Sequence, residues 1–139
     1  MRTVLADSCY FAGLFDPADA HHAACSRFFD GFNGDLVTTW AVFTEVSSLL
    51  PHHYSGAFFR WAARAEAAGK LRIESPPASA VSAIWQWMDK YDTLPMDFCD
   101  ASLVYLAIHL KITHIATVDV RDFTVYRLPG NKKFTLVLA

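Results

Sequence analysis

Four acidic residues that lie far apart in the sequence each stand beside a strongly apolar segment: Asp7, Glu45, Asp100 and Asp119. Ionised carboxylates are rarely buried unless they are paired or bind a metal ion. Clustered carboxylates also repel one another, which raises their pKa values unless a cation neutralises them. Because an all-oxygen ligand set favours a hard cation, these acids predict a site for Mg²⁺ or Mn²⁺ in preference to Zn²⁺.

A fifth acid, Asp97, stands one helical turn before Asp100, so both carboxylates project from one face of a helix. Each acid also has an ordinary structural explanation. Asp7 and Asp97 are suited to capping helices, and the helix dipole favours an acid such as Asp100 in a first turn. Glu45 can face solvent, and Asp119 can be a turn residue. If the acids do meet around Mg²⁺, the site suits phosphodiester hydrolysis, because the ion activates water and stabilises charge on phosphate.

The segments that carry these acids alternate between short apolar runs and amphipathic stretches. We expect strands over 2–7, 34–39, 70–75, 112–119 and 134–138, and helices over 8–15, 17–31, 40–52, 55–69, 76–91 and 96–111. Phe28 and Phe29 should face the core, and 120–133 should form a loop. This alternation predicts an α/β fold of three layers, in which helices flank a short, mostly parallel central sheet. Parallel strands would bring Asp7 and Asp119 to one sheet edge.

Length and composition limit the function further. A chain of 139 residues predicts one domain over 1–139, and a hydrophobic fraction of 53% indicates either a large core or a covered surface. The net charge of −2 excludes a protein held to nucleic acid by charge alone, but not a nucleic-acid enzyme that holds metal ions. Three cysteines without a C-x-x-C pair favour free thiols and a cytoplasmic location. We expect no signal peptide and no membrane span.

Three stretches carry a resemblance to a known family: VLADSCYFAGLF, TTWAVFTEVSSLL and MDFCDASLVYLAIHLKITHIATVDVRDF. Together, in this order and spacing, they resemble PIN-domain ribonucleases, and within that group the toxins of VapBC toxin–antitoxin pairs. The resemblance covers essentially the whole chain. It implies a Mg²⁺- or Mn²⁺-dependent endoribonuclease that cleaves RNA with a metal-activated water and is silenced by a cognate antitoxin. It also leads us to expect a homodimer.

The resemblance assigns roles to individual residues. It implies catalytic roles for Asp7, Glu45, Asp100 and Asp119, metal binding by Asp7, Asp97, Asp100 and Asp119, supporting roles for Ser8, Thr117 and Asp122, and RNA contacts by Arg60 and Arg121. The region 51–61 departs from the family, because it lacks the Arg-Gly type of sequence that many of these toxins carry after the Glu helix. This departure leaves the RNA contacts of that region open.

Alternatives of other classes remain at this point. The chain can be an inactive PIN-fold module that only binds a partner, or an RNA-processing nuclease that has no antitoxin. An aspartyl-phosphate receiver is disfavoured, because the paired acids after the first strand and the later Lys are missing. The adjacent aromatic residues Phe58, Phe59 and Trp61 cannot all face one core, so we predict that some of them lie at a protein interface.

Overall fold

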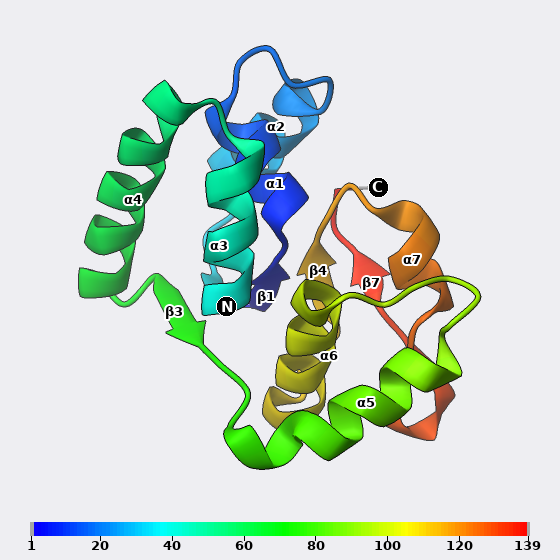
Figure 1. The fold of residues 1–139 in the computed structure, drawn as a ribbon. Coiled ribbons are helices and arrows are strands. Elements are labelled where there is room, and N and C mark those ends of the chain that lie inside the picture. The colour runs from blue at the N-terminus through cyan, green and yellow to red at the C-terminus, as the bar shows by residue number, and fades with distance from the viewer. Residues whose placement is uncertain (1, 139) are drawn as a thin grey trace.

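A parallel sheet forms the centre of the protein, which is described by a computed structural model over residues 2–138 (Figure 1). Within these residues the sheet has five strands in the order β3-β2-β1-β4-β7, and every neighbouring pair is parallel. The strands are β1 (Thr3–Ala6), β2 (Asp35–Thr39), β3 (Leu71–Glu74), β4 (His114–Ala116) and β7 (Thr135–Leu136). The expected short, parallel central sheet is therefore confirmed.

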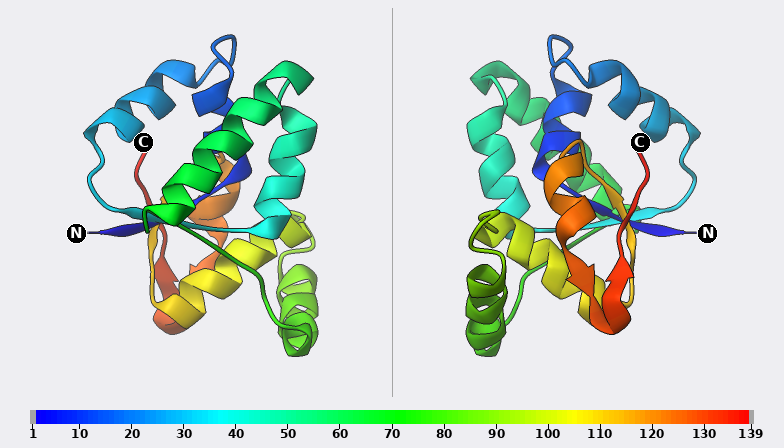
Figure 2. Two further views of the ribbon diagram at one scale, coloured as in Figure 1. Left: turned by 90° about the vertical axis from the view of Figure 1, so that its left-hand side faces the viewer. Right: turned by 90° about the vertical axis from the view of Figure 1, so that its right-hand side faces the viewer.

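Helices cover both faces of this sheet. They are α1 (Ser8–Phe15), α2 (His22–Gly31), α3 (Trp40–Leu49), α4 (His52–Ala67), α5 (Val81–Lys90), α6 (Phe98–Leu110) and α7 (Val120–Val125). Figure 2 shows α1 to α4 on one side of the sheet and α5 and α6 on the other. This arrangement confirms the predicted three-layer α/β fold. None of the helices within residues 2–138 has both the length and the apolar character to span a bilayer.

The sequence forms this sheet because its strands are apolar on both faces. Val4, Leu5 and Ala6 of β1 are completely buried, as expected for a central parallel strand that is covered by helices on each side. On α6, Leu103 and Leu106 are buried against the same core. Burying each of these large aliphatic side chains contributes about 1.5–3 kcal/mol. The core therefore fixes the ends of β1 and α6, which carry the acids of interest.

The position of β1 creates a switch point in the sheet. Its chain neighbour β2 pairs on one side, while β4, from the far end of the sequence, pairs on the other. Beyond the paired residues Ala6 and Ala116, the backbone N–H of Asp7 donates to the carbonyl oxygen of Ala116 over 3.1 Å. Ligands of open α/β sheets bind at such a point, beyond the carboxyl ends of the strands. Asp7 therefore lies where the topology favours a site.

The prediction of a helix beginning near Pro17 was wrong, because α2 begins only at His22. The side chains of Asp16 and Asp19 accept hydrogen bonds from the backbone N–H groups of the second residue after each of them (2.9 and 2.8 Å), which holds this segment in turns. The expectation that Phe29 faces the core was also wrong, since 38% of its surface is exposed. Phe28 does pack against the core.

The region after β4 differs most from the sequence-based expectation. The strand ends at Ala116, so Asp119 lies in the connection beyond it and not at the strand end. Residues 120–133 form helix α7 and a small antiparallel pair, β5 (Arg127–Leu128) and β6 (Lys132–Lys133), where a loop was expected. The helix was missed because its six residues are too few to show a helical period.

Candidate active site

Asp7 is the most deeply buried acid of the site, with 3% of its surface exposed. Its Oδ1 accepts a hydrogen bond from the backbone N–H of Ser8 (2.7 Å), so Asp7 caps α1. Its Oδ2 accepts bonds from the Thr117 hydroxyl (2.7 Å) and the Cys9 thiol (3.3 Å). Burial raises the pKa of Asp7. The three hydrogen-bond donors lower this pKa, whereas the charge of Glu45 raises it further. The carboxyl group is therefore held in a fixed orientation without a cationic side chain beside it.

Glu45 reaches the same place from α3. The hydroxyl group of Ser8 donates a hydrogen bond to Glu45 Oε1 and is also 3.4 Å from Asp7 Oδ1. One oxygen of Asp7, one of Glu45 and the sulfur of Cys99 all lie within 4.8 Å of one another. The predicted supporting roles of Ser8 and Thr117 thus have a physical basis, because each hydroxyl orients a carboxylate. No sequence pattern indicated a role for Cys99 in the site.

Asp100 lies in the first turn of α6 with 8% of its surface exposed. Its Oδ2 accepts a hydrogen bond from the hydroxyl group of Tyr126, which is completely buried (2.7 Å). The pKa of Asp100 is raised to about 8, mainly by burial and further by the charges of Asp97, Asp7 and Asp119, while the Tyr126 bond lowers it. Asp100 is therefore close enough to Asp97, Asp7 and Asp119 for their charges to affect its pKa.

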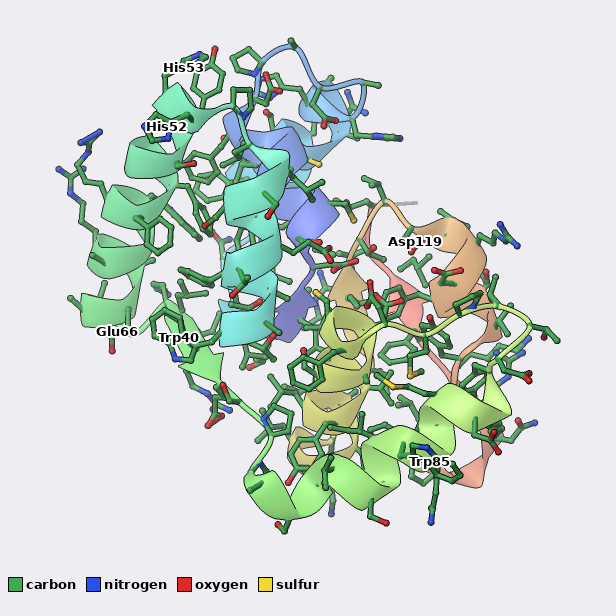
Figure 3. All side chains as sticks on the ribbon, in the orientation of Figure 1. Trp40, His52, His53, Glu66, Trp85 and Asp119 are labelled. Atoms are coloured by element: carbon green, nitrogen blue, oxygen red, sulfur yellow. The ribbon has the colours of Figure 1, made fainter. Side chains whose placement is uncertain are left out.

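A second group of acids lies on the α7 side of the site. Carboxylate oxygens of Asp100, Asp119 and Asp122 lie within 4.8 Å of one another. Figure 3 shows Asp119 at the start of α7, which it caps by accepting the backbone N–H of Asp122 (3.2 Å). Burial and Asp119 raise the pKa of Asp122 to about 6, and Arg121 opposes this shift. Asp122 is therefore part of the acidic cluster and not a loop residue.

Asp97 has a clear structural role. It is exposed and caps α6, because its Oδ1 accepts the backbone N–H of Asp100 over 2.8 Å. Its carboxylate belongs to neither group of closely spaced ligand atoms within residues 2–138. A residue that caps a helix can also belong to the site, since Asp7 and Asp119 cap helices as well. Asp97 stays a predicted metal ligand, supported only by its effect on the pKa of Asp100.

The two arginines predicted to contact RNA lie in different surroundings. Arg121 is exposed on α7 beside Asp122, whose pKa its charge lowers. Arg60 is exposed on α4, a helix that packs against β3, α1 and α3. Arg121 is therefore next to the acids. Arg60 is on α4, which lies on the side of α3 that faces away from α6 and α7 (Figure 1).

Tyr126 is, like Cys99, a residue of the site that the sequence analysis missed. It follows α7 and stands 26 positions after the acid that it contacts, so no local spacing reveals the pair. Edge-on packing against Tyr91 and Phe123, with ring centroids 5.0 and 5.2 Å away, holds its ring in place. Such outer contacts orient ligand groups and tune their proton affinity.

Replacing Tyr126 by Phe should weaken Mn²⁺ binding by about tenfold, the lower end of the usual effect of such outer contacts. In the wild type, the hydrogen bond from Tyr126 lowers the pKa of Asp100. Loss of this bond should therefore raise that pKa and shift Mn²⁺ binding to higher pH. Isothermal titration at several pH values would measure both effects. The matched control is Tyr105 to Phe on α6, whose ring stacks on His109. Equal Mn²⁺ affinity of both variants would contradict the assigned role.

The chemistry of these groups fits a divalent cation. Ion pairs found within residues 2–138 involve Asp19, Asp35 and Glu74, which all lie outside the cluster. In this part of the chain the clustered acids therefore form no ion pair, although the charge of Arg121 lowers the pKa of Asp122. Burial raises the pKa values of Asp7 and Asp100. Carboxylate oxygens are the ligands that Mg²⁺ and Mn²⁺ prefer. The carboxylates of the site are thus compatible with a divalent cation.

The PIN domain family matches residues 4–128, and the chain belongs to this family. Ribonuclease VapC26 from Mycobacterium tuberculosis (strain ATCC 25618 / H37Rv) is 25% identical over 134 residues, which cover 96% of this chain and 99% of the relative. The crystal structure of Mycobacterium tuberculosis VapC20, a sarcin-ricin loop cleaving toxin, is similar in fold. Its TM-score is 0.72 at 21% identity, over 85% of this chain and 91% of that one. These similarities support the interpretation of the sequence as a VapC-type PIN protein.

Proposed function

We propose that this protein is a Mg²⁺- or Mn²⁺-dependent endoribonuclease that acts in the cytoplasm as the toxin of a type II toxin–antitoxin pair. The observation that carries the proposal is the set of acids that four separate elements bring into two closely spaced groups, in which Asp7 and Asp100 are buried. The similarity to a ribonuclease over 96% of the chain supports the reaction class. The three free thiols are compatible with a reducing compartment.

We assign the metal ligands to Asp7, Asp100 and Asp119, with Asp97 as a further ligand. Glu45, which lies beside Asp7, completes the site or orients the attacking water. When bound, the metal would activate water and stabilise negative charge on the phosphodiester. Ser8 and Thr117 hold the carboxylates of Glu45 and Asp7 in place through their hydroxyl groups. This preorganisation means that the site need not rearrange as charge develops.

The two predicted arginines, Arg121 and Arg60, would bind and position the RNA. Arg121 is the exposed cation next to the acids, so it is placed to hold a phosphate of the bound strand. Arg60 would contact a more distant part of the RNA, along α4. Purified protein incubated with total RNA should release fragments with 5′-phosphate and 3′-hydroxyl ends when Mn²⁺ is present, and none with a chelator. End mapping of the fragments would test this, and cleavage in chelator would refute the metal requirement.

The antitoxin is expected to cover aromatic side chains on α3 and α4. Phe58 is completely buried, Trp61 is half-buried, and Phe59 is 43% exposed, so the three adjacent aromatics do not share one core, as predicted. Phe59 and the exposed Trp40 border a hollow of about 530 Å³. An apolar segment of a small protein encoded next to the toxin would fill this hollow.

Replacing Phe59 by Ser should reduce copurification with the antitoxin by about 30-fold, because a central aromatic contact contributes about 2 kcal/mol to binding. RNA cleavage should be unchanged, since the hollow is lined by residues other than the clustered acids. Phe29 to Ser provides the matched control, because Phe29 is a similarly exposed aromatic side chain on α2 that does not line the hollow. Undiminished copurification of the Phe59 variant would place the antitoxin elsewhere.

We also propose that the protein forms a homodimer. Support comes from a second group of exposed apolar side chains, Val81 and Trp85 on α5 and Phe98 at the start of α6, which are 50–70% exposed. Figure 3 shows Trp85 on the outer side of α5. Light scattering should report twice the mass of one chain, and a single-chain mass would refute the dimer.

A further inference from the structure

Cys99 makes one half of the acidic site chemically different from the other half. Its sulfur lies within 4.8 Å of a carboxylate oxygen of Asp7 and one of Glu45, whereas the group formed by Asp100, Asp119 and Asp122 contains oxygen ligands only. Cys99 is 7% exposed, and the hydrogen bonds within residues 2–138 leave its thiol without a partner. A buried, unpartnered sulfur therefore faces two carboxylates.

The backbone fixes Cys99 in this position. Its carbonyl oxygen accepts a hydrogen bond from the Ser102 hydroxyl (2.7 Å), which in turn is 2.8 Å from the Thr39 hydroxyl at the start of α3. This chain of contacts ties the first turn of α6 to the helix that carries Glu45. The backbone of Cys99 is thus held in place relative to the helix that carries Glu45.

We propose that Asp7, Glu45 and Cys99 form a binding site for a thiophilic divalent cation such as Zn²⁺. Zn²⁺ binds carboxylate oxygen at about 2.0–2.2 Å and thiolate sulfur at about 2.3 Å, which corresponds to about 3.5 Å between ligand atoms in a tetrahedral site. The ligand atoms lie within 4.8 Å of one another, so metal binding would require side-chain rotations that bring them closer together. The thiol proton is released to solvent when the sulfur binds the ion.

Such a site would regulate the enzyme, because Zn²⁺ and the catalytic metal would compete for Asp7, which both sites share. Sulfur is a poor ligand for Mg²⁺ and Mn²⁺ but a good one for Zn²⁺. Zn²⁺ bound by Cys99 and Asp7 would therefore make Asp7 less available to the catalytic metal. Zn²⁺ should therefore act as an inhibitor that excess Mn²⁺ reverses only slowly. This inhibitory effect rests on the proposed nuclease function, whereas the binding of the ion does not.

Cd²⁺ is the direct probe, because sulfur bound to Cd²⁺ produces a charge-transfer absorption in the ultraviolet. The wild-type protein should show this band at one equivalent of Cd²⁺, and Cys99 to Ser should abolish it. Titration should also show that Zn²⁺ binds the Cys99 variant at least about tenfold more weakly. The fold of the variant is checked by its near-ultraviolet circular dichroism and its melting temperature.

The other two cysteines provide matched controls. Cys9 already contacts Asp7, Thr117 and the N–H of Val118 through its sulfur, and Cys25 is buried outside the site. Both Cys9 to Ser and Cys25 to Ser should retain the Cd²⁺ band. Loss of the band in either of these variants, or its survival in Cys99 to Ser, would overturn the proposal. A wild-type protein that shows the band but cleaves no RNA would refute the nuclease function and leave this site intact.

Discussion

Replacing Asp100 by Asn should reduce RNA cleavage by on the order of 10³-fold, which corresponds to about 4 kcal/mol of lost transition-state stabilisation. Asn has the same shape but supplies no negative charge to a metal ion. Its side-chain oxygen can still accept the Tyr126 hydroxyl group, so the contact that orients this position is retained. The loss should therefore appear in catalysis and not in folding.

The same variant should be more stable than the wild type above pH 8 when no metal is present. Burial and neighbouring acids raise the pKa of Asp100 to about 8, so its ionised form destabilises the folded state, and Asn removes this charge. We expect a gain of about 2 kcal/mol in the free energy of unfolding. Urea unfolding and RNA cleavage would be measured on the same preparation.

Asp92 to Asn supplies the matched control for this experiment. Asp92 is exposed in the loop between α5 and α6, so its replacement should change neither activity nor stability by more than about 0.5 kcal/mol. If the Asp100 variant retains more than about one tenth of the wild-type rate, Asp100 is not part of the catalytic site. If it unfolds, the residue is needed for structure instead.

Mn²⁺ should stabilise the protein strongly at pH 8 and hardly at all at pH 5. Without metal, Asp100 is protonated in the folded state up to a pKa of about 8, whereas in the unfolded chain it ionises near its ordinary value of 3.8. Between these two values the folded state binds more protons than the unfolded state. Its stability is therefore highest below the ordinary pKa and falls as pH rises toward the folded pKa.

A divalent cation reverses this loss, because it binds the ionised carboxylates that protons otherwise neutralise. At 100 times its dissociation constant, an ion that binds only the folded state adds about 2.7 kcal/mol. For a domain of this size this corresponds to about 5–10 °C in melting temperature. Scanning calorimetry at both pH values, with Mn²⁺ or with chelator, would measure it, and the Asp100 to Asn variant should lose most of the difference. Equal shifts at pH 5 and pH 8 would show that the ion binds elsewhere.

The sequence predicted most of the sheet and the main acids, because both depend on patterns that are local in the chain. Each strand of a parallel sheet is a short apolar run, and Asp7 is recognisable because it directly follows one. Asp100 is recognisable because it interrupts an apolar helix. These signals require only a few neighbouring residues, so they are visible without any knowledge of tertiary contacts.

The residues that the sequence analysis missed depend on contacts between distant segments. Tyr126 looks like an ordinary core aromatic, and only the packing of α6 against β5, which directly follows Tyr126, brings its hydroxyl group to Asp100. Cys99 looks like a small apolar residue of α6, and only the junction with α3 turns its sulfur toward Glu45. The wrong start of α2 has a different cause, since Asp16 and Asp19 favour turns as readily as helix starts.

The hydrogen bond from Thr117 to Asp7 joins residues that are 110 positions apart in the chain. A site closed by so distant a contact forms late in folding, because long-range contacts require the largest loss of chain entropy. During synthesis, the first acid emerges from the ribosome long before the segment that completes its surroundings. For a protein that destroys RNA, this order delays activity until nearly the whole polypeptide has been made. Ribosome-bound chains that stop before residue 117 should therefore cleave no RNA, and cleavage by such chains would disprove this timing.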